Sequence, residues 1–273
     1  MRKISTLLIL FAVSNLTFIS CDSDEQTPVN ETDSSSVVAS MTIDAVNALD
    51  LQTGIQTTTE NTASGKNSTS YNETCATISL DNASGYPKTF TVDYGNGCTI
   101  GQIIRKGKLE ITISAPIIQT GSIMTIERLD YSINNLKFEG TITYVNKTTN
   151  DLVPQWTRTV TNGKFTNYFG QVFTNSGSYT VQKTAGVETP FLLSDDIYGI
   201  IEGQHVVTGE TGETLTLTVL ETLIKKSNCD FISKGKITIK GGLLNGVVDY
   251  GNNDCDNNYT YTHENGMVYN LMM

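Results

Sequence analysis

The stretch Lys137-Phe138-Glu139-Gly140-Thr141-Ile142-Thr143-Tyr144 decides the fold, because polar and apolar side chains alternate along it. Lys108–Ser114 and Glu213–Leu220 alternate in the same way. Successive side chains of a β-strand point to opposite faces, so a period of two predicts strands with one buried and one solvated face. Antiparallel sheets allow this arrangement, whereas parallel sheets are covered on both faces. The pattern therefore predicts antiparallel strands.

The chain beyond about residue 71 repeats this pattern between short turn signals. Thr supplies 40 of the 273 residues, and Thr suits a pleated, half-buried surface. Gly and Asn tolerate positive φ and mark turns at Asn134-Asn135, Thr161-Asn162-Gly163, Asn175-Ser176-Gly177, Glu210-Thr211-Gly212 and Asn265-Gly266. We expect about 12 to 14 strands in an all-β fold, built as a large curved sheet or barrel-like meander. A two-sheet β-sandwich is the alternative.

The segment before this β region predicts one short helix. Val37, Val38, Met41, Ala45, Val46 and Leu49 recur at spacings of three and four. This spacing indicates a helix from about 36 to 50. The acidic, Ser- and Thr-rich residues 21–36 are expected to form a flexible tether. Residues 37–70 then comprise the helix and a linker, and 71–273 the β domain, with two related units inside it.

The amino terminus has the composition of an export signal. Arg2 and Lys3 precede the apolar segment 6–13, which is too short to span a bilayer, and Ser20 precedes Cys21. This arrangement resembles a bacterial lipoprotein signal peptide, in which residues 1–20 are removed and Cys21 is lipidated. The resemblance implies a palmitate-type lipid anchor, so that the protein is attached to the membrane without spanning it.

An acidic run, Asp22-Ser23-Asp24-Glu25, follows directly. It resembles the export tag of surface-exposed lipoproteins of Bacteroidota. The resemblance implies an outer-membrane lipoprotein that faces the cell surface rather than the periplasm. An acidic linker that only keeps the tether solvated is the alternative.

The cysteines support an exported chain. Once Cys21 is set aside, the even set Cys75, Cys98, Cys229 and Cys255 remains. Asp93-Tyr94-Gly95-Asn96-Gly97-Cys98 echoes Asp249-Tyr250-Gly251-Asn252-Asn253-Asp254-Cys255, and a second Cys precedes each segment. Four cysteines allow three connectivities, and the echo favours Cys75–Cys98 and Cys229–Cys255. Together with the Cys21 signal, these segments resemble a group of uncharacterised secreted lipoproteins of Bacteroidota. The resemblance implies no activity.

Charge and motif content limit the classes of function. The net charge of −10 argues against binding nucleic acid through its phosphates. Only two His are present, and no nucleophile elbow, zinc-protease motif or phosphate loop occurs. Asp195-Asp196 could contribute to a glycosidase pair, although acidic pairs at a strand entrance are more often solvated turns. The sequence leaves catalysis uncertain and leans against an enzyme.

One oxygen-rich segment is a candidate calcium site. Its ligands would be Asp249, Asp254, Asp256 and Asn258. Calcium prefers such hard oxygen ligands, but Tyr259 stands where a calcium loop has Gly and Asn265 where it has Glu. A turn rich in Asx residues is the favoured interpretation. We expect no cofactor apart from this candidate structural calcium.

Three functional classes remain open. A surface binding or adhesion module comes first, because a tether, a rigid scaffold and polar faces are present without a catalytic constellation. A carrier of an apolar ligand in a concave sheet comes second, and a hydrolase third. The expected partners are the membrane, through the anchor, and a glycan, protein or lipid ligand. Trp156 and its aromatic neighbours could stack on a sugar, although a core cluster is favoured.

Overall fold

The computed structural model describes residues 31–64, 75–81, 84–189 and 192–272, with the helix side chains described from 35 to 59. This part holds one α-helix, α1 (Glu31–Ser64), a short 3-10 turn η1 (Leu193–Asp195) and fourteen strands. The strands are β1 (Thr77–Leu80), β2 (Lys88–Asp93), β3 (Cys98–Ile100), β4 (Ile103–Ile113), β5 (Ile123–Ile133), β6 (Leu136–Asn146), β7 (Gln155–Thr166), β8 (Val172–Ala185), β9 (Ile197–Thr208), β10 (Thr214–Lys226), β11 (Lys234–Lys240), β12 (Gly246–Asn252), β13 (Asn258–His263) and β14 (Val268–Met272). The signal peptide and Cys21 lie outside the described residues.

All the described strands belong to one antiparallel sheet. Its order is β1-β2-β4-β5-β6-β7-β8-β9-β10-β11-β12-β13-β14, and β3 pairs with β4 at the side of this path. Apart from β3, each strand therefore lies next to the strand that follows it in the chain, as the predicted meander requires. The sheet is curled and open, since β1 and β14 form its two edges. The all-β prediction is confirmed, and the first-choice curved sheet is found rather than the sandwich.

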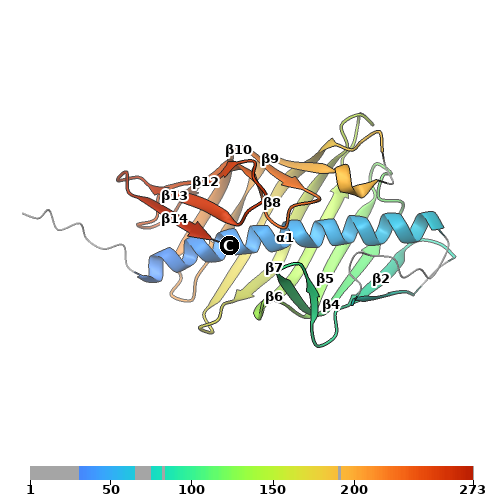
Figure 1. The fold of residues 1–273 in the computed structure, drawn as a ribbon, viewed down its shortest axis with the longest axis horizontal. Helices are drawn as coiled ribbons and strands as arrows, with labels where there is room; N and C mark the ends of the chain where they lie inside the picture. Colours follow the sequence, from blue (N-terminus) through green and yellow to red (C-terminus); the bar gives the residue numbers. More distant parts are fainter. Residues whose placement is uncertain (1–30, 65–74, 82–83, 190–191, 273) are drawn as a thin grey trace, which may run out of the picture.

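The single helix lies across the strands on one face of the sheet (Figure 1). Its N-terminal half is near β12, where the Tyr250 hydroxyl contacts Met41 Sδ at 3.1 Å. Its C-terminal half is near β4, where Arg105 bonds to Thr53 at 2.8 Å. With 34 residues it is longer than the predicted helix and includes residues expected to be tether and linker. Among the residues the structure describes, no helix has both the length and the apolar character needed to cross a bilayer.

Glycines inside the strands bend the sheet around the helix. Gly107 and Gly140 have φ of 78° and 100° and coincide with register shifts between β4 and β5 and between β6 and β7. A Cβ atom on Gly140 would lie 2.5 Å from the carbonyl oxygen of Asn162, so only Gly fits there. Bulges of this kind increase the bend and twist of a sheet, which helps it to curl.

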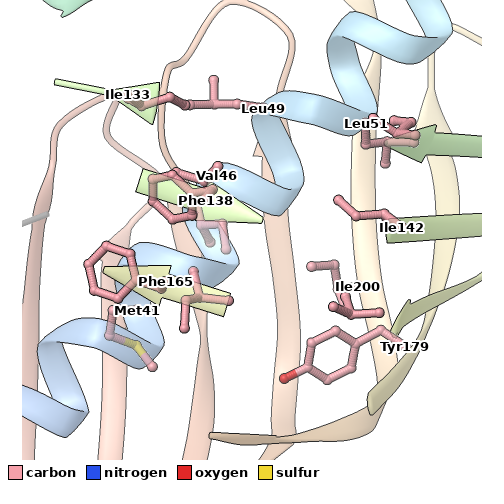
Figure 2. Close-up of a cluster of buried hydrophobic side chains, with 14 of the residues drawn as sticks. Met41, Val46, Leu49, Leu51, Ile133, Phe138, Ile142, Phe165, Tyr179 and Ile200 are labelled. Atoms are coloured by element: carbon pink, nitrogen blue, oxygen red, sulfur yellow. The ribbon is translucent and has the colours of Figure 1, made fainter. Parts of the chain in front are cut away.

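The hydrophobic core fills the space between the sheet and α1. In β6 the residues Phe138, Ile142 and Tyr144 are buried and the residues between them are not, as their alternation predicts. Figure 2 shows such inward-facing side chains together with Met41 and Val46 of the helix. Inward-facing side chains from strands along most of the sheet therefore pack against α1 to form the core.

The two echoed segments form the same local structure near the two edges of the sheet. The Gly95 amide donates to Asp93 Oδ1, and the Gly251 amide donates to Asp249 Oδ1, both at 2.8 Å. The following cysteines form the bridges Cys75–Cys98 and Cys229–Cys255, with Cα–Cα separations of 5.3 and 5.1 Å. The pairing inferred from the echo is confirmed.

Candidate functional site: a cavity beside the buried helix

A polar stripe on α1 faces the sheet. Its members recur every three or four residues, as they must to share one side of a helix. They are Ser36, Ser40, Asp44, Asn47, Asp50 and Thr53, and all are buried. On a surface helix such a stripe would face water. Here it lies against the sheet, so its charges need partners from the strands.

The sheet supplies those partners from inward-facing positions. They are Arg105 of β4, Arg128 of β5, Arg158 of β7, His205 of β9 and Lys225 of β10, and all are buried. The alternation of each strand places these side chains on the same face as its apolar core residues. A band of cationic and imidazole groups therefore crosses the floor of the curled sheet below α1.

Arg128 and Asp50 form the shortest ion pair in this band. Arg128 Nη2 lies 2.6 Å from Asp50 Oδ2, and its Nε donates to the same oxygen at 2.9 Å. The Tyr131 hydroxyl donates to the other carboxylate oxygen at 2.8 Å, and Asn47 Oδ1 accepts from Arg128 at 2.8 Å. Burial raises the pKa of Tyr131 well above its usual value, which keeps this hydroxyl a donor.

A second group surrounds Asp44. Arg158 Nη2 lies 3.1 Å from Asp44 Oδ1, and His205 Nδ1 lies 3.4 Å from the same oxygen. The Tyr179 hydroxyl is 2.7 Å from His205 Nδ1. Burial lowers the pKa of His205; Asp44 acts in the opposite direction, and Arg158 lowers it further. The imidazole is therefore held in its neutral form.

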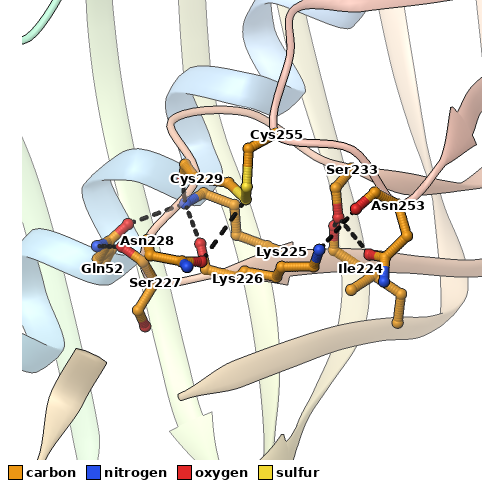
Figure 3. The surroundings of a disulfide bond; sticks show 10 residues. All are labelled: Gln52, Ile224, Lys225, Lys226, Ser227, Asn228, Cys229, Ser233, Asn253 and Cys255. Atoms are coloured by element: carbon orange, nitrogen blue, oxygen red, sulfur yellow. Dashed lines mark hydrogen bonds between the residues drawn. A yellow bond between two sulfur atoms is a disulfide. The ribbon is translucent and has the colours of Figure 1, made fainter. Parts of the chain in front are cut away.

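Lys225 connects the helix to the second disulfide loop (Figure 3). Its ammonium donates to Gln52 Oε1 and to the carbonyl of Lys226, both at 2.9 Å, and to the carbonyl of Cys229. Burial lowers the pKa of Lys225 to about 8. The Cys229–Cys255 bridge thus closes a loop that contacts α1 directly through this cation.

The side of α1 away from the polar stripe borders a cavity of about 1010 Å³. Ligand pockets commonly have volumes of about 300–1,000 Å³, so this space is at the upper end of that range. Its helix wall consists of Ser35, Val38, Ala39, Thr42, Ala45, Val46 and Leu49. Its sheet wall includes Ile103, Ile133, Leu136 and Phe165, and Phe231 and Met272 also line it. The lining is mostly apolar and contains no charged side chain.

The turn between β7 and β8 forms part of the cavity's rim. Tyr168 and Phe169 line the cavity and yet are 65% and 88% exposed to solvent. Asn134, Asn167 and Gln171 add uncharged polar groups to the lining. An apolar space with a few amide and hydroxyl groups suits a ligand that has an apolar body and an uncharged polar end.

The acidic pair considered for catalysis and the two His residues do not converge on this cavity. Asp196 pairs with Lys183 at 2.6 Å, and Asp195 accepts from Thr189 at 2.7 Å. Burial raises the pKa of Asp196. His205 lies beneath the helix, whereas His263 is bonded to a loop carbonyl at 2.6 Å. Trp156 is a buried core residue next to Tyr198, as favoured over sugar stacking.

The candidate calcium ligands are divided between two strands, β12 with Asp249 and β13 with Asn258, and the turn that joins them. Asp249 lies in β12 and contacts Lys236 at 3.7 Å, whereas Asp254 and Asp256 lie in the turn before β13. Asp256 Oδ1 accepts from the Asn258 amide at 3.0 Å, as in an Asx turn. Within the described ranges, no group of three or more His, Cys, Asp or Glu is placed to hold a metal ion. The calcium site stays a prediction.

Sequence reasoning missed the residues that hold the helix. Arg128 follows Met124 and Ile126 at the same two-residue spacing, so it occupies an inward-facing position of β5. This two-residue spacing was the signal in the sequence that Arg128 points inward. The partner of Arg128 is the buried Asp50 of the helix. The cavity itself has no comparable signal, because its walls come from segments far apart in the chain.

We compared the chain with models of protein families, with curated proteins and with solved structures, and none of them matches it.

Proposed function

We propose that this protein is a lipid-anchored extracytoplasmic carrier of an apolar, uncharged ligand, which binds between α1 and the curled sheet. The observation that carries the proposal is the cavity of about 1010 Å³ with its uncharged, mostly apolar lining. Burial of apolar ligand surface there would supply about 25 cal/mol per Å² of binding free energy. The N-terminal signal and the two disulfides support an exported protein.

The lining also sets the charge of the ligand. A carboxylate or phosphate buried in the cavity would find no cationic side chain among the lining residues. An unpaired buried charge carries a large desolvation penalty, which would weaken the binding of an ionised lipid. A neutral lipid with a hydroxyl or ester end avoids this penalty and can bond to the amides of Asn134, Asn167 or Gln171. We therefore expect a monoacylglycerol to bind more tightly than a fatty acid with the same chain.

The test is direct binding of a monoacylglycerol with a fluorescent acyl chain, kept below the concentration at which it aggregates. We expect saturable binding to the parent protein and at least about tenfold weaker binding to Ala45→Phe, whose new ring occupies the cavity. Leu152→Phe is the matched control, because Leu152 is 71% exposed in the turn between β6 and β7, outside the cavity. Thermal melting of both variants checks folding. Equal affinities for Ala45→Phe and the parent would contradict the proposal.

A row of eight hydroxyl side chains and one amide on the outer face supports a second candidate, the surface binding module. Its members pair in register from β2 to β11, and none is buried. They are Thr89, Thr112, Thr125, Thr143, Thr159, Ser178, Gln204, Thr218 and Thr238. Adjacent strands lie about 4.8 Å apart, so the row offers a regular array of polar groups. A polyhydroxylated polymer such as a glycan fits this array.

This second candidate is tested by pull-down on insoluble cellulose, chitin and peptidoglycan. If the row binds a glycan, the double variant Thr143→Lys/Thr159→Lys should abolish retention, because both side chains lie at its centre. Lys is placed at two solvent-facing positions, so the fold should persist, and a melting curve checks this. Retention that is unchanged in the variant, or no retention of the parent, counts against adhesion through this face.

A further inference from the structure

We propose that the turn between β7 and β8, residues 167–171, is a membrane-contact element that places the cavity mouth on a lipid bilayer. The inference rests on the proposed function, because it identifies the bilayer as the source or destination of the ligand. The partner of the turn is an uncharged or zwitterionic lipid surface. The argument comes from exposure, local rigidity and charge.

The exposure of Phe169 is unusual for its position. Its ring is 88% exposed, although a large apolar cavity lies directly beside it. Tyr168, the preceding residue, is 65% exposed, and Met272, which also lines the cavity, is 68% exposed. Three large side chains at the lining of one cavity therefore present apolar surface to solvent. Large apolar side chains that are exposed together at one cavity are typical of a site of interaction with a protein or a membrane.

The turn holds Phe169 outward through its own hydrogen bonds. Asn167 Oδ1 accepts from the amides of Phe169 and Gln171, both at 3.0 Å. The Tyr168 hydroxyl donates to the carbonyl of Asn134 at 2.7 Å, which fixes the turn against the neighbouring turn between β5 and β6. Gly170, with φ of 79°, closes the turn. The ring is therefore presented by a rigid scaffold.

Charge favours a lipid surface over other apolar partners. The five residues of the turn, Asn167 to Gln171, carry no charge, and neither does the cavity lining behind them. Aromatic side chains with polar ends, such as Tyr, concentrate at the boundary between headgroups and acyl chains. With a net charge of −10, the chain is repelled by anionic lipids, so contact through a neutral aromatic turn suits zwitterionic lipids.

The position of the anchor agrees with this orientation. Ser35 lines the cavity, and α1 begins at Glu31, ten residues after Cys21. If Cys21 carries the proposed lipid, ten residues span at most roughly 36 Å in any conformation. The start of the helix, and the cavity wall that it forms, therefore cannot lie far from the bilayer surface.

The experiment uses the expected mature chain, residues 21–273, with Cys21→Ser, so that neither the apolar signal segment nor acylation at that position can supply the membrane contact. Phe169→Trp in this background is mixed with phosphatidylcholine vesicles, and tryptophan emission is recorded as a difference from the background protein, whose single Trp156 is buried. We expect a blue shift, and quenching by brominated lipids. Leu152→Trp is the matched control, since it is also well exposed but lies at the opposite ends of the strands.

Vesicle flotation provides a second measurement. Phe169→Ser should lower the vesicle-bound fraction about tenfold, because burial of a Phe side chain in the bilayer strengthens membrane partitioning by at least about that factor. Leu152→Ser should leave it unchanged. No blue shift at position 169, an equal shift at position 152, or equal flotation of the two Ser variants overturns the proposal. Binding of the soluble monoacylglycerol is measured separately on the parent protein, so failure of the membrane contact and failure of the carrier function are distinguishable.

Discussion

The two sides of α1 have opposite surroundings. The sheet-facing side carries Asp44 and Asp50, which pair with arginines at 3.1 and 2.6 Å. The cavity-facing side carries Val38, Ala45 and Leu49, which border open space. A surface helix would direct its charges to water and its apolar residues to the core. In this protein the polar side is packed against the sheet, and the apolar side, although Ala45 and Leu49 are buried, borders the cavity.

This difference suggests how the cavity is kept open. Buried ion pairs add little net stability, because the loss of hydration offsets their attraction. They are directional, however, and a helix rotated about its axis would leave Asp50 and Arg128 buried without partners. Hydrophobic contacts alone would fix this rotation less sharply, because α1 carries buried apolar residues around most of its circumference. The ion pairs therefore hold the helix in the one rotation that leaves Val38 and Leu49 facing the cavity.

The largest expected effect comes from removing one partner of the shortest pair. Asp50→Leu leaves Arg128 buried without its carboxylate, which should lower the free energy of unfolding by about 3–5 kcal/mol. The double variant Asp50→Leu/Arg128→Met removes both charges and should recover most of that loss. Urea unfolding monitored by circular dichroism measures both. A double variant as unstable as the single one would show that the pair itself, rather than the unpaired charge, carries the stability.

The next largest effect should come from added side-chain volume, which should lower the free energy of unfolding by different amounts on the two sides of the helix. A Cβ atom on Gly54 would lie 2.9 Å from Met124 Sδ, so Gly54→Leu should overpack the sheet-facing side and lower the free energy of unfolding by about 1–3 kcal/mol. Ala45→Leu adds its methyl groups toward the cavity and should change stability by less than about 0.5 kcal/mol. Thermal melting compares the two. A comparable loss in both variants would mean that the cavity-facing side is packed as tightly as the other.

A smaller effect should appear as the pH falls. Burial lowers the pKa of His205 in the folded protein, so the unfolded chain binds this proton more readily, beginning near its usual pKa of about 6.5. Stability contributed by the neutral imidazole is therefore complete above pH 6.5 and is lost progressively below it. His205→Asn, whose amide can still bond to Tyr179, should lose less stability than the parent between pH 7.5 and about 5.5. Urea unfolding across that range measures the difference, and parallel pH profiles would exclude His205 as the source.

The sequence contained enough information for the sheet and for the disulfides. The alternation in β6 places Phe138 and Tyr144 in the core, as expected, because period two has only one structural meaning in an antiparallel sheet. The repeated Asp-Tyr-Gly-Asn segments identified the partners of Cys98 and Cys255. These features depend on residues close together in the chain, where local pattern and geometry coincide.

The extent of the helix was harder to predict. Thr53 and Thr57 are poor helix formers, and the segment that contains them was expected to be a linker. In the structure both are buried within α1, where contact with the sheet outweighs their weak intrinsic preference. The cavity was harder still, since it depends on the rotation of α1, and that rotation depends on pairs such as Asp50–Arg128, which are 78 residues apart.

The smallest expected effect concerns an ion pair of similar length on the outer face of the sheet. Lys108 Nζ lies 2.9 Å from Asp93 Oδ2, but these side chains are 49% and 36% exposed, whereas those of Arg128 and Asp50 are 2% and 0% exposed. Water solvates either charge when the other is removed, so Lys108→Met should change the free energy of unfolding by less than about 1 kcal/mol, and 0.5 M salt should reduce even that. Urea unfolding at low and high salt measures it beside Asp50→Leu. If Lys108→Met were as destabilising as Asp50→Leu, burial would not explain the strength of the inner pair, and the argument that the ion pairs orient α1 would lose its physical basis.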